Sequence, residues 1–212
     1  MFKFSSKTEV NKQIKITDLF KTIKADKQTR AASQNVQSVT LTHVLSEATT
    51  GLKSAENITE IYFIDMVTTD KRVPIELIKA MDKTILFQVF YTIKCGSDQK
   101  FIATYKTIEA GKATFTKHYE SDWVKESAKL DFPLVTELGD IFMIALQNIT
   151  SRKFQSGESI RDYLSRLAVI DRLTRDIEKT ERMMNSATQP KDKLALHAEL
   201  KKLKQAKEEV IL

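Results

Sequence analysis

The sequence predicts an α+β fold: a mostly antiparallel sheet with helices packed on one side, followed by a C-terminal antiparallel helical hairpin that resembles a coiled coil. Residues 59–120 contain runs that are either continuously apolar or alternate between apolar and polar residues, and polar turns separate these runs. Both patterns are typical of strands. From Ser159 onward the apolar residues recur at steps of three and four, the period of a helix. With 212 residues and 42% hydrophobic side chains, the chain is long enough for an α+β domain over residues 1–150 and a hairpin over residues 151–212.

The N-terminal part of the domain is predicted to contain short helices and two strands. The segment DLFKTIK places its apolar residues on one helical face, and KQTRAASQNV predicts a second short helix. VQSVTLTHVLS (residues 36–46) and TEIYFIDMVT (residues 59–68) are rich in β-branched and aromatic residues and predict strands. Pro74 suits the first turn of a helix that continues to about Lys83.

Three strand-like runs follow: ILFQVFYTI at residues 85–93, FIATYKTI at residues 101–108 and ATFTKHYE at residues 113–120. The turn segments CGSDQK and EAGK separate them. The sequence therefore predicts a β-α unit followed by an antiparallel meander. LGDIFMIALQNI, residues 138–149, is apolar around most of its circumference and predicts a buried helix that closes the domain.

Two narrow apolar stripes predict the hairpin. The polar segment NSATQPKD separates them, and its Pro190 suits the first turn of the final helix. Because neither stripe is wide, we expect the two helices to cover each other and a protein partner to bind along the same groove. Packing within the chain alone, or association of two copies through the hairpin, are the alternatives. The stripe residues expected to bind the partner are Leu167, Ile170, Ile177, Leu196, Leu200 and Leu203.

The net charge of +6 is concentrated at the two ends of the chain. Residues 1–30 carry a surplus of five positive charges and residues 152–212 a surplus of four, around a slightly acidic middle. Direct binding of DNA or RNA is therefore an alternative function, with Lys201, Lys202 and Lys204 contacting phosphates. A solvated surface without such a role explains the same charges.

Composition restricts the class of protein. Cys95 is the single cysteine, which excludes an internal disulfide and a multi-cysteine zinc site and fits a reducing cytoplasm. The N-terminus has no apolar run of the signal-peptide kind, and no segment is apolar enough to span a membrane. We therefore expect a soluble, cytoplasmic protein without a membrane partner. A lone cysteine beside a glycine turn is weak evidence for a reactive thiol.

The HYESDW segment holds the densest group of candidate ligands. His118, Glu120 and Asp122 would share one strand face, where they could bind a metal or transfer protons. The alternative, which we favour, is that Tyr119 and Trp123 anchor the end of an edge strand while the charged residues meet solvent.

A divergent metal-dependent nuclease is the third hypothesis. Asp65 lies in one predicted strand and Lys106 in another, but no carboxylate stands two residues before that lysine. Nucleotide-phosphate loops and the hydrolase nucleophile elbow are missing. We interpret His43 as a strand residue with a satisfied hydrogen bond and His197 as a packing or register position near the stripe of the final helix. The sequence therefore predicts no catalytic, cofactor-binding or metal-binding residue, and no cofactor.

Separated short motifs carry a family resemblance. They are Ser6 to Lys12 followed by Ile14, Glu60-Ile61, Asp82-Lys83 with Ile85 to Phe87, Tyr105-Lys106, Tyr119 to Trp123, and Leu196 to Leu200 with Leu203. In this order they resemble a bacterial domain-of-unknown-function family over nearly the whole chain. The chain departs from that family at His197, where members often have Asn, and at Thr84-Ile85, where they often have an Ile-Pro pair.

The resemblance implies a role but no chemistry. Members of that family are frequently encoded beside helicases and DNA methyltransferases in bacterial defence and restriction loci. It therefore implies a non-catalytic accessory subunit of such a DNA-acting system, with a helicase or methyltransferase as the larger partner docked through the hairpin. It supplies no catalytic residues.

Overall fold

The chain divides into two compact units, Met1–Lys153 and Phe154–Leu212. The first contains the sheet and the second contains two long helices. The structure is a computed structural model that describes residues 4–55, 58–109, 112–126 and 135–211.

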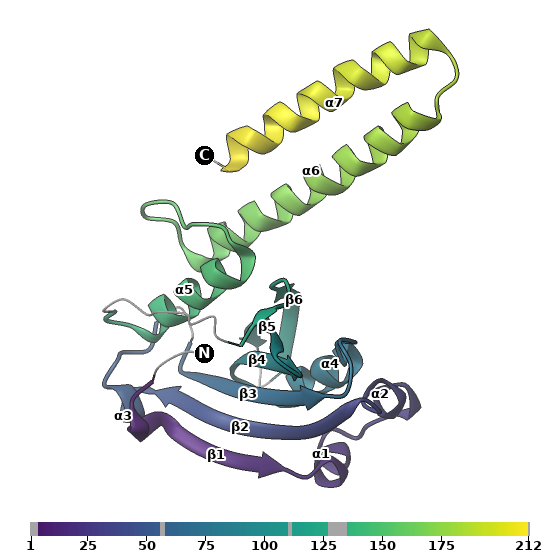
Figure 1. Ribbon diagram of the computed structural model, residues 1–212. Helices are drawn as coiled ribbons and strands as arrows, with labels where there is room; N and C mark the ends of the chain where they lie inside the picture. Colours follow the sequence, from purple (N-terminus) through teal and green to yellow (C-terminus); the bar gives the residue numbers. More distant parts are fainter. Residues whose placement is uncertain (1–3, 56–57, 110–111, 127–134, 212) are drawn as a thin grey trace. The chain divides into compact units, whose positions relative to one another are not determined.

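In the described part of the first unit, seven strands form one sheet with the order β1-β2-β3-β4-β5-β6, and β7 pairs with β5 (Figure 1). β3 and β4 are parallel and are connected by helix α4, whereas the other pairs are antiparallel. The strands are β1 (Glu9–Ile14), β2 (Val36–Ser46), β3 (Glu60–Thr68), β4 (Gln88–Cys95), β5 (Asp98–Glu109), β6 (Lys112–Glu120) and β7 (Val124–Lys125).

Helices pack on the sheet through a few large side chains. On one face, α1 and α4 contribute Leu19 and Met81 to the core. On the opposite face, the Phe142 ring of α5 lies 5.1 Å from the Phe90 ring and 5.8 Å from the Tyr105 ring, between centroids. The helices of this unit are the 3-10 turn η1 (Ser6–Thr8), α1 (Ile16–Thr22), α2 (Lys27–Ala32), α3 (Glu47–Thr50), α4 (Ile75–Thr84) and α5 (Leu138–Thr150).

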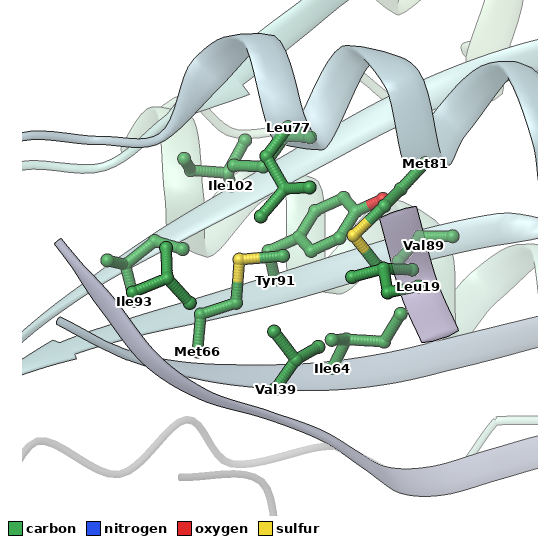
Figure 2. Close-up of a cluster of buried hydrophobic side chains, with 12 residues drawn as sticks. Leu19, Val39, Ile64, Met66, Leu77, Met81, Val89, Tyr91, Ile93 and Ile102 are labelled. Atoms are coloured by element: carbon green, nitrogen blue, oxygen red, sulfur yellow. The ribbon is translucent and has the colours of Figure 1, made fainter. Parts of the chain in front are cut away.

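β4 is the buried centre of the sheet. Because successive side chains of a strand point to opposite faces, Tyr91 enters the α4 side while Phe90 enters the α5 side, and both are buried. Burial on both faces explains why ILFQVFYTI is nearly continuously apolar. Figure 2 shows Leu77 and Met81 of α4 directed at Tyr91 and its neighbours. Each such fully buried side chain contributes about 1.5–3 kcal/mol of transfer free energy.

The second unit is a helical hairpin of α6 (Ile160–Ser186) and α7 (Pro190–Ile211), which pack against each other (Figure 1). Ser159 caps α6, since its side chain accepts a hydrogen bond from the Asp162 amide at 3.2 Å. Ala187 adopts an extended conformation and ends α6 before the turn into α7.

The predicted α+β fold class is confirmed, including the mostly antiparallel sheet, the β-α unit followed by a meander, and the hairpin. The expectation that the helices pack on one side was wrong, because α5 packs on the face opposite to α1 and α4. β1 was not predicted. It is an edge strand whose residues are exposed or half-buried, so its sequence shows no apolar alternation. Among the described residues, none of the helices is both long and apolar enough to cross a membrane.

Candidate functional site

A buried polar network is centred on Asp82, near the C-terminal end of α4. Its Oδ1 accepts hydrogen bonds from the Tyr91 hydroxyl at 2.9 Å and from the Lys106 ammonium at 2.7 Å. Its Oδ2 accepts from the Thr104 hydroxyl and from His118 Nε2, each at 2.9 Å. The side chains of Asp82 and Lys106 have no exposed surface, and that of His118 is 15% exposed.

The four elements α4, β4, β5 and β6 position this network, and β4 contributes Tyr91. Asp82 lies one helical turn after Ile78 on the sheet-facing side of α4. Thr104 of β5 and His118 of β6 are direct partners across the antiparallel pair, so their side chains share a face. Lys106 follows two residues after Thr104, and its Nζ also donates to the carbonyl of Ile85 at 3.0 Å. The network therefore joins α4 to β4, β5 and β6.

Burial and hydrogen bonding act in opposite directions on these groups. Burial alone would raise the pKa of Asp82, but the His118 hydrogen bond and the charge and hydrogen bond of Lys106 outweigh it, and this pKa is lowered from 3.8. Burial lowers the pKa of Lys106 from 10.5, against the opposing effect of Asp82. Burial, then Asp82, raises the pKa of Tyr91 well above 10. Asp82 is thus a carboxylate at neutral pH and accepts a hydrogen bond from the Nε2–H group of His118.

The contacts of Asp82 give it a stabilising role. A carboxylate offers about four acceptor positions, and here four donors occupy them. The network holds α4 to the sheet.

Sequence reasoning did not identify Asp82 as a network residue. Two signals point to it. One is a carboxylate on the apolar face of α4, one turn from Ile78. The other is Lys106, a charged residue inside the strand-forming run FIATYKTI. A buried charge of each sign in two neighbouring elements favours an ion pair between them.

Asp65, the carboxylate of the nuclease hypothesis, lies elsewhere. Ile64 and Met66 face α4, so Asp65 points to the opposite face of the sheet, where its Oδ2 lies 2.8 Å from Lys94 Nζ. Lys106 faces α4 and pairs with Asp82. Asp65 and Lys106 are therefore separated by the sheet. Across the described residues, no group of three or more His, Cys, Asp or Glu side chains could hold a metal ion.

The HYESDW residues do not form a common site. Glu120 pairs with Lys100 Nζ at 3.1 Å, and Asp122 is exposed beyond the end of β6. Tyr119 is buried and Trp123 packs against the core, in agreement with the anchoring interpretation. For His118, the expectation of a solvent-facing residue was wrong, because the cross-strand pairing with Thr104 directs it to Asp82.

Three other residues considered in the sequence, His43, His197 and Cys95, are not among the side chains that contact Asp82. His43 is half-buried on β2, its ring centroid 5.1 Å from that of Phe4, and burial lowers its pKa. His197 is exposed on α7, so its interpretation as a packing residue was wrong: it lies beside the apolar stripe and not in it. Cys95 is a free, half-buried thiol at the end of β4.

The hairpin brings together the six stripe residues predicted to bind a partner. Leu167, Ile170, Ile177 and Leu200 are buried, while Leu196 and Leu203 are half-buried. Because α6 and α7 pack against each other, burial within the chain accounts for the seam. Binding of a partner by these residues stays a prediction.

The three lysines predicted to contact phosphates are on the surface of α7. Lys201, Lys202 and Lys204 are exposed, and Lys204 Nζ lies 3.0 Å from Glu181 Oε1 of α6. Lys204 therefore has a counter-charge within the hairpin.

The comparisons with known proteins give one match. The family model described as "Domain of unknown function (DUF4391)" matches residues 2–206, nearly the whole chain, so the chain belongs to this family. No match was found among curated proteins or among solved structures. The match confirms the domain-of-unknown-function resemblance. The description names no reaction, ligand or partner, and the helicase and methyltransferase gene neighbours stay a prediction.

Proposed function

We propose that this member of the DUF4391 family is a non-catalytic interaction subunit that docks a larger, DNA-acting protein through its helical hairpin. The non-catalytic part of the proposal rests on the family resemblance, which supplies no catalytic residues. The hairpin supplies the docking surface.

Exposed apolar side chains at the hairpin tip carry the proposal. Met183, in the last turn of α6, is 48% exposed, and Leu194, in the second turn of α7, is 77% exposed. Packing between α6 and α7 buries the seam residues, but it leaves Met183 and Leu194 exposed. Large apolar side chains left in water at the end of a helical hairpin are the kind of anchor that a protein partner buries.

The class of partner rests on the family resemblance. A helicase or a DNA methyltransferase of a defence or restriction system is the proposed partner, and the complex is cytoplasmic. A second copy of this chain is the competing occupant of the tip.

Affinity purification of the tagged full-length protein from its native cells tests the proposal. The lysate is treated with nuclease and the bound proteins are identified by mass spectrometry. We expect a stoichiometric DNA-acting protein with the wild type and its loss with the Met183→Glu/Leu194→Glu variant. The matched control is Val10→Glu/Ile108→Glu, which places the same charges at residues of the first unit that are 43% and 41% exposed. Retention of the partner by the tip variant, or recovery of this chain alone, contradicts the proposal.

Direct nucleic-acid binding is the second candidate, favoured by the exposure of Lys201 and Lys202. Phosphate binding releases counterions, so the affinity for DNA or RNA should fall steeply with salt. Replacing both lysines by glutamine should reduce the slope of log affinity against log salt by about two. Absent or salt-insensitive binding removes this candidate.

A further inference from the structure

A cavity of about 540 Å³ opens on the α4 side of the first unit. Leu41, Tyr62 and Ile64 of β2 and β3 contribute to its floor, while α1 and α4 form walls that include Leu19 and Met81. Leu19, Ile64 and Met81 lie together at one end of the core cluster in Figure 2. The volume is in the range of pockets that hold small molecules, about 300–1,000 Å³, and the lining is mainly apolar, as in such pockets.

The cavity follows from the lengths of the helices. α1 has seven residues and α4 has ten, so neither is long enough to cover the sheet across its whole width. Tyr62 and Leu41 are consequently only half-buried although they lie on the core side of the sheet. An apolar ligand group bound here would remove the remaining apolar surface of these two residues from water, with a favourable free energy of about 25 cal/mol per Å² buried.

Two lysines stand at the mouth of the cavity. Lys12 is the direct cross-strand partner of Leu41, so its side chain lies on the cavity face, and Lys15 is the N-cap residue of α1. Both are exposed, and neither forms an ion pair with another described residue. Asp18, the acidic residue of the lining, lies 3.8 Å from Lys21, and the lining contains two lysines, Lys12 and Lys15, against this one carboxylate.

Tyr62 contributes a neutral hydroxyl to the floor of the cavity. Burial, then the neighbouring Glu60, raises the pKa of this hydroxyl to about 12. Tyr62 also stacks on Phe87, with ring centroids 5.2 Å apart. The cavity thus combines an apolar, partly aromatic interior with a positive mouth.

We propose that this cavity binds a small amphipathic anion of the fatty-acid type, with its apolar chain between α1 and α4 and its carboxylate at Lys12 and Lys15. The apolar lining selects the chain, and the positive mouth selects the sign of the head group. All lining residues of this site belong to the first unit.

Isothermal titration of the full-length protein with dodecanoate, below its micelle concentration, tests the proposal. Dodecyltrimethylammonium carries the same chain with a cationic head, and acetate carries the head without the chain. We expect saturable binding of dodecanoate, and affinity for the other two that is weaker by about tenfold or more. Equal affinity for the two dodecyl compounds overturns the assignment of the anion site, and absence of dodecanoate binding overturns the cavity as a ligand site.

Variants locate the binding in this cavity. Lys12→Glu/Lys15→Glu should weaken dodecanoate binding by about tenfold or more, because two attractive charges at the mouth become repulsive. The matched control, Lys7→Glu/Lys27→Glu, changes the net charge equally at exposed residues outside the lining and should bind as the wild type does. Thr22→Trp, an exposed position on the rim, should block entry. Unchanged binding by the first variant and by Thr22→Trp overturns the proposal.

Discussion

The Nζ atom of Lys106 lies 2.7 Å from Oδ1 of Asp82, and neither side chain has any exposed surface. The pair connects α4 to β5, and His118 extends the connection to the edge strand β6. An ion pair without solvent is costly to form, but it is far more costly to break by removing one partner. The loss of stability on removing either charge should therefore depend strongly on whether the other charge is present.

The first prediction concerns this dependence. Asp82→Asn leaves the Lys106 ammonium buried without a counter-charge, so the free energy of unfolding should fall by about 3–5 kcal/mol. In Asp82→Asn/Lys106→Met neither charge remains, and the asparagine oxygen still accepts a hydrogen bond. The double variant should therefore lose less stability than the sum of the two single variants. Urea unfolding of the four proteins measures this coupling.

Asp122→Asn, at an exposed aspartate, is the control and should change stability by no more than about 0.5 kcal/mol. Simple additivity would show that the two charges do not depend on each other.

The second prediction concerns acid. The pKa of Asp82 in the folded protein is below its ordinary value of 3.8, so the unfolded chain binds the proton more readily. The stabilisation from the carboxylate is therefore fully present above about pH 4 and is lost as the pH falls through the folded pKa. The difference in unfolding free energy between wild type and Asp82→Asn should be constant near neutrality and should shrink in acid. Urea titrations over a series of pH values measure it; a difference that grows in acid would contradict the assigned direction.

The sequence predicted the fold further than it predicted the network. Runs such as ILFQVFYTI and the stripe through Ile170 and Ile177 are local patterns set by burial, and the structure contains the corresponding elements. The contact between Asp82 and His118 joins residues 36 positions apart, and only the register of β5 with β6 brings them together. Register is set by packing and bulges across strands, which a single sequence does not display. The edge strand β1 was missed for a related reason, because exposure removes its apolar signature.

The third prediction concerns the ion pair across the hairpin. Lys204 and Glu181 are 52% and 41% exposed, so water and salt screen their attraction. Glu181→Gln should cost the hairpin less than about 1 kcal/mol, and the charge swap Glu181→Lys/Lys204→Glu should be close to wild type. Native-state hydrogen exchange of the α7 amides reports the local stability. A loss of several kcal/mol in Glu181→Gln would show that the pair, and not the apolar seam, holds the helices together.

The fourth prediction separates packing from docking. Leu200 is 7% exposed and lies in the seam, whereas Leu194, six residues earlier on the same helix, is 77% exposed. Leu200→Ala leaves a space between α6 and α7 and should cost about 2 kcal/mol or more, seen as faster hydrogen exchange along α7. Leu194→Ala removes no internal contact of this size and should change stability by less than about 0.5 kcal/mol.

In partner binding the order of the two variants should be reversed: Leu194→Ala should have the larger effect and Leu200→Ala the smaller. Leu194→Ala should weaken capture of the partner while leaving the exchange rates of α7 unchanged, because the truncated side chain belongs to the exposed tip. Leu200→Ala should retain the partner under conditions where the hairpin stays folded, since the tip residues are intact. If Leu200→Ala abolishes capture in a folded hairpin while Leu194→Ala does not, the partner contacts the seam instead of the tip, and the docking surface must be reassigned to the stripe residues.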